Sequence, residues 1–332
     1  MESKKKFKPD RRLKLMDQVK QVMRYHHYAY RTEKTYSDWI LRYIRFFGAK
    51  YHPKDMGKTQ IEAFLSNLAI KERVSASTQR QALNALIFLY RNVLDKPIEE
   101  EIEPVRAKRN RRPPVVMAQS EVRQVLSNIN GIHLLMANLL YGSGLRLMEC
   151  IRLRVHDVDF KRNLLYIRAA KGGKDRTTIL PAHTKDSLKD QIQKVKTLHD
   201  EDLARGFGEV YLPQALGRKY RSAGRQLGWQ YVFPAKKMSK DPRSGKFRRH
   251  HVLESGLQKA VKSAANRAGI VKRIGCHTFR HSFATHMLEN GVNIRVVQEL
   301  MGHSDVRTTE IYTHVMEKNL TAVTSPLDNL HA

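Results

Sequence analysis

The sequence predicts a mainly α-helical protein with a small β-sheet, divided into two domains. Three observations support this fold class. Apolar residues recur at helical spacing through residues 11–95. A basic stretch punctuated by prolines follows them. Beyond that stretch, two short strand-like segments lie within further helical sequence.

Four apolar stripes predict the helices of the N-terminal domain, which we place at residues 1–95. They run from Leu13 to Met23, Tyr36 to Phe47, Ile61 to Leu68 and Leu83 to Tyr90. Candidate N-cap residues are Thr32, Thr59 and Ser77. We therefore expect a compact four-helix domain with many Lys and Arg residues on its outer faces.

Residues 96–117 predict a basic linker between the domains. The prolines are Pro97, Pro104, Pro113 and Pro114, and the cations between them include Arg106 and Arg112. Proline spacing favours an extended chain. The charge could simply keep that chain solvated. We favour a basic arm that follows a nucleic acid duplex.

A second domain is predicted at residues 118–332. Its sequence is helical at first, and residues 164–168 and 176–180 then read as two short strands. Lys171 lies in the glycine-containing turn between them, where glycine supplies positive backbone dihedrals. Helical patterns return from residue 253.

The charge balance indicates a polyanionic partner. Lys and Arg number 61 against 32 Asp and Glu, which gives a formal net charge of +29 and a pI of about 10.2. Such an excess favours nucleic acid over a membrane surface. We see neither an apolar span of ~20 residues nor a secretory signal. Cys150 and Cys276 show neither a disulfide framework nor metal-ligand spacing, so we expect a protein of the reducing cytoplasm.

Residues 205–251 combine cations with aromatic side chains. They hold twelve Lys or Arg against two acidic residues, together with Trp229 and six Phe or Tyr residues. Unpaired bases stack on aromatic rings, at ~1–3 kcal/mol per base. An ordinary insertion whose aromatics pack on the domain has the same composition. Composition alone leaves the two interpretations equal.

The last third of the chain carries residues suited to cleaving a phosphodiester with a tyrosine. Guanidiniums bind the non-bridging oxygens of the transition state through paired hydrogen bonds, and Arg146 and Arg280 are the candidates. Tyr312 is the candidate nucleophile, which needs a base or a positive field because its reference pKa is ~10. His277 and His303 are candidates for proton transfer. Lys171 could protonate the departing alkoxide.

Helical spacing makes this set credible. His277 and Arg280 are three residues apart, so they share a face of one helix. Gly302 can end the preceding helix and place His303 just past its C-terminus. Ser304 or Asp305 would then cap a short helix that carries Tyr312.

Other chemistries are less well supported. Taken singly, each of these residues is more often a surface cation, a satisfied histidine or a core tyrosine, and only their joint arrangement favours a site. The histidines show no cysteine or carboxylate partners at metal-ligand spacing. No phosphate loop followed by Lys-Ser or Lys-Thr is present. We therefore expect neither a metal nor a nucleotide cofactor.

The motifs resemble those of the tyrosine site-specific recombinases. The matching segments are Gly144-Leu-Arg146-Leu-Met-Glu149, His277-Thr-Phe-Arg280-His281-Ser-Phe-Ala-Thr, Leu300-Met-Gly-His303 and Ile311-Tyr312-Thr-His314. The resemblance covers nearly the whole chain. Residues 205–251 are similar to the extra insertion of the integron integrases.

The resemblance implies a helical core-binding domain and a mixed α/β catalytic domain that form a C-shaped clamp around DNA. It implies a homotetrameric synapse and a covalent 3′-phosphotyrosine at Tyr312. Arg146 and Arg280 would hold the phosphate, Lys171 would be the general acid, and His277 and His303 would assist. Glu149 would be a supporting residue. The tail from Val315 to Leu330 would dock on a neighbouring protomer.

The subgroup resemblance implies that the enzyme inserts and excises gene cassettes. Its substrates would be folded single-stranded cassette sites with extrahelical bases and a double-stranded primary site. The residues that would grip the extrahelical bases are Trp229, Pro242, His250 and His251. The alternatives are a recombinase of ordinary duplex sites, such as a chromosome-dimer-resolving enzyme, a non-catalytic DNA-binding protein and a relaxing topoisomerase.

Overall fold

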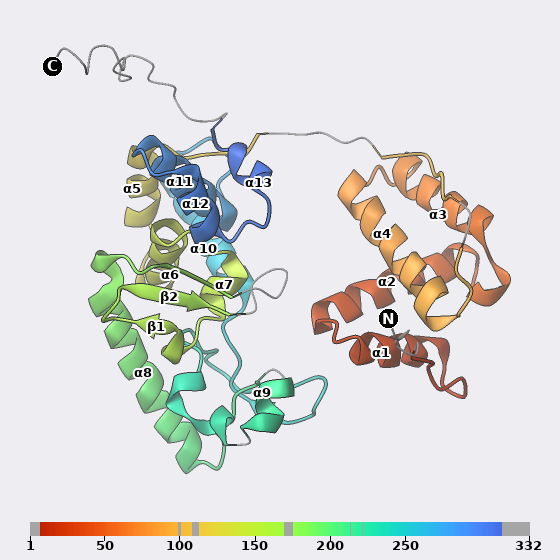
Figure 1. The fold of residues 1–332 in the computed structure, drawn as a ribbon, viewed down its shortest axis with the longest axis horizontal. Helices are drawn as coiled ribbons and strands as arrows, with labels where there is room; N and C mark the ends of the chain where they lie inside the picture. The colour runs from red at the N-terminus through yellow and green to blue at the C-terminus, as the bar shows by residue number, and fades with distance from the viewer. Residues whose placement is uncertain are drawn as a thin grey trace. The chain divides into compact units, whose positions relative to one another are not determined.

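The computed structural model describes residues 7–98, 101–107, 113–168, 175–212, 214–220 and 222–313. The chain forms two compact units, Met1–Arg112 and Pro113–Ala332. The described residues are mainly helical with two small sheets, as the sequence predicts (Figure 1). None of the helices that the structure describes is both long and apolar enough to span a membrane.

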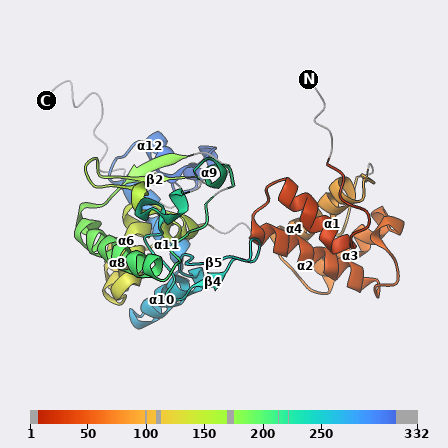
Figure 2. The same cartoon turned by 90° about the horizontal axis from the view of Figure 1, so that it is seen from below.

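The first unit contains the four expected helices. They are α1 (Leu15–Tyr25), α2 (Tyr30–Phe46), α3 (Lys58–Ile70) and α4 (Ala76–Phe88), followed by a π-helical turn at Leu89–Val93. The two views show them packed side by side (Figures 1 and 2). The hydroxyls of Tyr43 and Tyr90 lie 3.0 Å apart within this core, and Tyr90 donates to the carbonyl of Pro53 at 2.9 Å. Both phenols are thereby satisfied although they are buried.

The N-caps expected in this unit were wrong. All three residues lie within the first turn of a helix: Thr32, Thr59 and Ser77. The cap of α4 is Ser75, whose hydroxyl accepts from the backbone N–H of Thr78 at 3.2 Å. A serine two residues earlier therefore satisfies the orphan N–H that a cap must reach.

The second unit surrounds a central helix. It contains α5 (Gln119–Ser127), α6 (Gly131–Gly142), α7 (Leu147–Ile151), α8 (Lys185–Ala204), α9 (Gln214–Lys219), α10 (Glu254–Arg267), α11 (Cys276–Glu289), α12 (Ile294–Met301) and α13 (Arg307–Glu310). The central helix α6 contacts α5, α7, α10 and α11. Figure 1 shows α11 to α13 at one end of this unit and α9 at the other.

The sheet of the second unit is antiparallel, in the order β1 (Val158–Asp159), β2 (Leu164–Ile167) and β3 (Arg176–Ile179). The two predicted strands are β2 and β3, paired from Leu164 opposite Ile179 to Ile167 opposite Arg176. The turn that contains Lys171 lies outside the described residues. Strand β1 and the hairpin of β4 (Ser239–Lys240) and β5 (Phe247–Arg248) have two residues each, too few for an alternating pattern to predict.

The C-terminal helices meet the sheet where α12 contacts β3. Gly302 ends α12 as expected, in the left-handed conformation at φ +61°. The expectation that the next helix carries Tyr312 was wrong, because α13 ends at Glu310. Tyr312 instead lies in a following turn, where its N–H donates to the carbonyl of Thr309 at 3.0 Å.

Gly144, two residues before Arg146, lies in a tightly packed part of the second unit. Its φ is +60°, and an added Cβ would lie 2.5 Å from Phe283 Cδ1. Gly144→Ala should therefore cost more than the ~1–3 kcal/mol of backbone strain alone. Gly269→Ala is the matched control, because its φ is +68° and no atom lies within 4 Å of the new Cβ. Thermal unfolding of the two variants should show a larger loss for Gly144→Ala, and equal losses would contradict this packing.

Candidate active site

Three arginines converge on the C-terminal end of α12. Three successive backbone carbonyls there each accept a hydrogen bond from a different guanidinium. The pairs are Leu300 with Arg176 at 3.0 Å, Met301 with Arg280, and Gly302 with Arg146 at 3.2 Å. The last carbonyls of a helix have no partner within it and carry its negative dipole end. The sequence therefore supplies cations where the end of α12 needs hydrogen-bond donors.

Glu149 on α7 binds the same arginines from the other side. Arg176 donates to both carboxylate oxygens, at 2.9 and 2.7 Å, and Arg146 donates through its side chain at 2.7 Å and its backbone N–H at 2.8 Å. Arg280 lies 3.8 Å away. Burial would raise the pKa of Glu149, but the hydrogen bonds and charges of Arg176 and Arg146 lower it to about 2. Glu149 is thus a carboxylate at neutral pH, and the cluster keeps a net positive charge.

Arg280 on α11 is the most enclosed of the site cations. Its side chain is 4 % exposed, and it donates to the carbonyls of Gly144 and Met301. Burial, and then the positive charge of Arg146, lower the pKa of Arg280 to about 9. It therefore remains charged at neutral pH.

His303 follows α12 and contacts Arg280 directly. Its Nε2 lies 3.2 Å from a guanidinium nitrogen of Arg280, and its Nδ1 lies 2.9 Å from the hydroxyl of Thr309. A guanidinium only donates hydrogen bonds, so Nε2 must accept and the proton must sit on Nδ1. Burial, followed by the charges of Arg280 and Arg146, lowers the pKa of His303 to about 4. The structure therefore holds a neutral imidazole beside the arginines.

Tyr312 is buried next to this histidine. It is 2 % exposed and packs in an apolar cluster with Phe283 and Met301. Its hydroxyl lies 2.9 Å from His281 Nδ1, and its ring is nearly parallel to that of His303, with the centroids 6.4 Å apart. Burial raises the pKa of Tyr312, while the charges of Arg280 and Arg146 oppose that shift. In this conformation the phenol is protonated and paired with an imidazole.

His277 lies one turn before Arg280 on α11. Part of its side chain is exposed, and its ring centroid is 6.3 Å from that of His281. Partial burial and the charges of Arg280 and Arg146 lower the pKa of His277. It therefore belongs to the same electrostatic environment.

The structure brings together most of the residues singled out from the sequence. They are Arg146, Glu149, His277, Arg280, His303 and Tyr312. Lys171 lies outside the described residues. Two further residues of the cluster, Arg176 and His281, were not expected to contribute. His281 was visible beside Arg280 in its motif, whereas an arginine that begins a strand gave no signal in the sequence.

The insertion residues form a separate aromatic cluster. Tyr231 is its centre: its ring lies 5.5 Å from His250, 5.3 Å from His251 and 4.5 Å from the guanidinium carbon of Arg154. Arg154 also donates to the carbonyl of Trp229. The Trp229 ring lies 4.3 Å from that of His156.

These insertion residues differ in how accessible they are. Pro242 is exposed in the turn between β4 and β5, while Trp229 and His250 are half-buried. His251 is 6 % exposed, and burial lowers its pKa to about 4. Arg249 fixes the segment through two hydrogen bonds to Asp202, at 2.5 and 2.7 Å.

Most of the sequence matches known protein families and relatives. Residues 115–319 match the phage integrase family, and residues 15–100 match the phage integrase N-terminal SAM-like domain. Proteins named integrase/recombinase from Escherichia coli and Pseudomonas aeruginosa are 46% identical over 324 residues, which cover 97% of this chain and 95% of each relative. Tyrosine recombinase XerA of Thermococcus onnurineus is 32% identical over 294 residues, 87% of this chain and 86% of that protein.

Solved structures share the fold. A lambda integrase dimer bound to a COC′ core site has a TM-score of 0.58 at 14% identity, over 93% of this chain and 98% of that one. XerH site-specific recombinase bound to difH substrate in a pre-cleavage complex has a TM-score of 0.57 at 19% identity, over 88% and 79%. The chain belongs to the phage integrase family, the tyrosine recombinases. Membership of this family implies cleavage and rejoining of DNA strands.

Because His281 and His303 are neutral in the folded protein, we predict that the free energy of unfolding depends on pH. Burial lowers the pKa of both His281 and His303 to about 4, whereas an unfolded histidine titrates near ~6.5. Between these values the unfolded chain binds protons that the folded chain does not. The free energy of unfolding should therefore fall as pH falls from about 6.5 to about 4.

Denaturant unfolding measured across this pH range tests the expectation. His281→Asn removes one of the titrating groups and should make the pH dependence shallower. His183→Asn, at an exposed position of the same unit, is the control for loss of a histidine. Equal slopes in the two variants would contradict the assignment of a half-buried, neutral imidazole at residue 281.

Proposed function

We propose that this protein breaks and rejoins DNA strands through a covalent 3′-phosphotyrosine at Tyr312. One observation carries the proposal: a buried, net-positive arginine cluster lies against the same histidine on which the Tyr312 ring stacks. Such a cluster offers fixed hydrogen-bond donors to the charge that develops on a phosphate in the transition state. The ester with tyrosine conserves the energy of the broken bond, so the reaction needs no nucleotide.

Each residue of the cluster has a role in this proposal. Arg146 and Arg280 bind the non-bridging phosphate oxygens, and Glu149 supports their orientation. His303, neutral and with its proton on Nδ1, and His277 assist proton transfer and transition-state binding. Lys171 is the proposed general acid that protonates the leaving oxygen. Neither a metal nor another cofactor takes part.

The burial of Tyr312 means that catalysis requires a movement. A phenol that is 2 % exposed cannot reach a DNA phosphate from its present position. The preceding helix α13 has only four residues, so few helical hydrogen bonds oppose its displacement. We propose that DNA binding releases Tyr312 from His281 and turns it toward the arginines. The tail from Val315 to Leu330, beyond the described residues, would then dock on a neighbouring protomer.

The proposed assembly is a tetramer on DNA. The chain has a formal net charge of +29, and the similar lambda integrase and XerH structures were solved bound to DNA. The domain limits we propose are 1–95 for the core-binding domain, 96–117 for the linker and 118–332 for the catalytic domain. The two domains would clamp the duplex, and four protomers would form the synapse.

We further propose that the enzyme is an integron integrase that inserts and excises gene cassettes. The supporting feature is the insertion at about residues 205–251, with its cations and its aromatic cluster around Tyr231. Trp229, Pro242, His250 and His251 would contact the extrahelical bases of a folded single-stranded site. The primary site would be double-stranded.

A recombinase of ordinary duplex sites is the second candidate. Two observations favour it: His251 is 6 % exposed, so its side chain is packed within the insertion, and a relative 32% identical over 87% of this chain is named XerA. A non-catalytic DNA-binding protein of this fold is less well supported, because it would not need a buried tyrosine beside the arginine cluster.

Tyr312→Phe should abolish a covalent adduct while DNA binding is retained, because only the nucleophilic oxygen is removed. The substrates are a labelled hairpin with extrahelical bases and its fully paired counterpart, each nicked beside the cleavage point to trap the intermediate. The measurement is a protein–DNA band that survives denaturation. An adduct that persists in Tyr312→Phe would rule out this nucleophile. An adduct on the paired duplex alone would favour the second candidate.

Trp229→Ala should weaken binding to the bulged hairpin more than binding to the paired duplex. Loss of one stacked base costs ~1–3 kcal/mol, which is roughly 5-fold to 150-fold in affinity. Phe247→Ala, which removes an aromatic ring 59 % exposed in the same insertion, is the control. Equal losses on the two DNAs for Trp229→Ala would refute a contact with an extrahelical base.

A further inference from the structure

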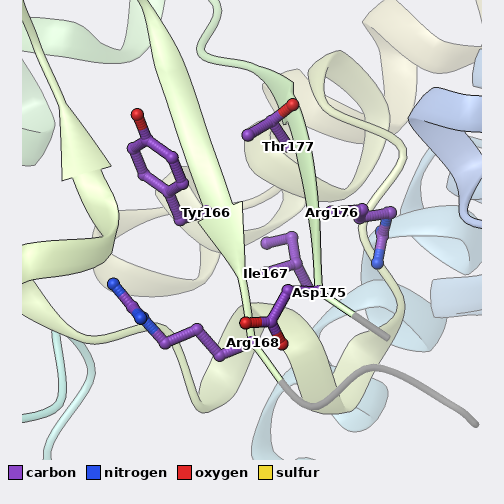
Figure 3. Close-up of a pocket in the computed structure, with 6 residues that line it drawn as sticks. All are labelled: Tyr166, Ile167, Arg168, Asp175, Arg176 and Thr177. Atoms are coloured by element: carbon purple, nitrogen blue, oxygen red, sulfur yellow. The ribbon is translucent and has the colours of Figure 1, made fainter. Parts of the chain in front are cut away.

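Arg176 has no role in the chemistry described so far, yet all three of its guanidinium nitrogens are hydrogen-bonded within the cluster. It begins β3, and its side chain is 8 % exposed. Figure 3 shows that it leaves the strand on the side opposite to Arg168 and Tyr166. On that side it meets both α7 and α12.

The contacts of Arg176 use all three of its nitrogens. Nε donates to the carbonyl of Leu300 at 3.0 Å, and the two terminal nitrogens donate to the two oxygens of Glu149 at 2.9 and 2.7 Å. Gly302 closes over the side chain, since a Cβ there would lie 2.6 Å from Arg176 Cδ. Each guanidinium nitrogen of Arg176 therefore already donates to an acceptor within the protein.

The paired hydrogen bonds from Arg176 to Glu149 limit how closely that carboxylate binds the other two arginines. A carboxylate offers about four acceptor positions. Arg176 takes one on each oxygen, and the side chain and the backbone N–H of Arg146 take the other two, while Arg280 lies 3.8 Å away. Without Arg176, Glu149 would keep only its two hydrogen bonds from Arg146, and it would draw Arg146 and Arg280 closer, because a poorly paired charge in the interior is costly.

The second contact controls the end of α12. The carbonyl of Leu300 lies three residues before His303, whose Nε2 must meet Arg280 at 3.2 Å. Arg176 therefore links β3 to the end of α12, just before His303.

We infer that Arg176 is a positioning residue of the strand-cleavage reaction. It binds both carboxylate oxygens of Glu149, so that Arg146 and Arg280 stay available to phosphate, and it fixes the end of α12 through the carbonyl of Leu300. This inference rests on the proposed function. In this role Arg176 does not contact DNA. It acts indirectly, through its hydrogen bonds to Glu149 and to the carbonyl of Leu300.

The test compares Arg176→Met, Arg176→Lys, Glu149→Gln and the double variant Arg176→Met/Glu149→Gln. Adduct formation is timed at saturating protein on a nicked, fully paired site, and DNA affinity is measured separately. Arg176→Met should slow adduct formation about a hundredfold, the effect of a misplacement of ~1 Å, while the affinity stays unchanged. Arg176→Lys should recover little of the rate, since a single ammonium cannot make the fork.

The double variant separates positioning from general loss of structure. Glu149→Gln removes the carboxylate that would otherwise capture Arg146 and Arg280. The double variant should therefore cleave faster than Arg176→Met alone. A double variant as slow as Arg176→Met, or slower, would overturn the role through Glu149. A parallel loss of DNA affinity in Arg176→Met would instead make Arg176 a DNA contact and also overturn the inference.

Arg249→Met is the matched control for a lost buried guanidinium. Arg249 makes the same kind of fork on Asp202 and also donates to two carbonyls, those of Ala235 and Lys236. It should lower the melting temperature comparably without a comparable loss of adduct on paired DNA. Equal losses of adduct in Arg249→Met and Arg176→Met would contradict a specific role for Arg176.

An activity-free measurement keeps the inference distinct from the proposed function. If the unmodified protein forms no adduct on any substrate, the proposed function fails. Amide hydrogen exchange of the segment Ile294–Met301 still tests the second contact, because loss of the Arg176 hydrogen bond should speed exchange in α12. Unchanged exchange in Arg176→Met would overturn that contact's role.

Discussion

The arginine cluster of the catalytic unit depends on one largely buried carboxylate, that of Glu149. Moving a carboxylate out of water costs several kcal/mol, and only close charged partners offset that cost. Here the partners come from three separate elements: Arg176 from β3, Arg146 from the start of α7, and Arg280 from α11. Three guanidiniums without an anion would repel one another. Glu149 thus makes a dense positive site compatible with a folded protein.

The positive site determines the state of the groups around it. His303 stays neutral because burial, and then the charge of Arg280, lower its pKa. The contact of its Nε2 with that guanidinium fixes its proton on the side of Thr309. Tyr312 lies close enough for Arg280 and Arg146 to oppose the effect of burial on its pKa. A phosphate would add negative charge to the same place and weaken these effects. Binding of a phosphate should therefore raise the pKa of both His303 and Tyr312.

Sequence patterns predicted the four helices of the first unit, the helices at the start and end of the second unit, β2, β3 and most of the cluster, because apolar periodicity and short motifs are local properties. They did not predict α8 or α9. The helix stop at Gly302 was also predictable, since only glycine tolerates that conformation easily. Arg176 was not predictable: alternation along a strand gives the face of a residue but not its partner on another element. Burial of Tyr312 and His251 depends on packing between distant segments, which no local pattern records.

The carbonyl contacts at the end of α12 also bear on conformational entropy. An arginine side chain that becomes fixed loses roughly 2 kcal/mol of rotamer freedom. Arg280 is already held by the carbonyls of Gly144 and Met301, and Arg146 by that of Gly302. The ordering of both side chains therefore belongs to the folding of the protein rather than to the encounter with its ligand. A larger part of the enthalpy of each contact between these arginines and a phosphate then contributes to the free energy of binding.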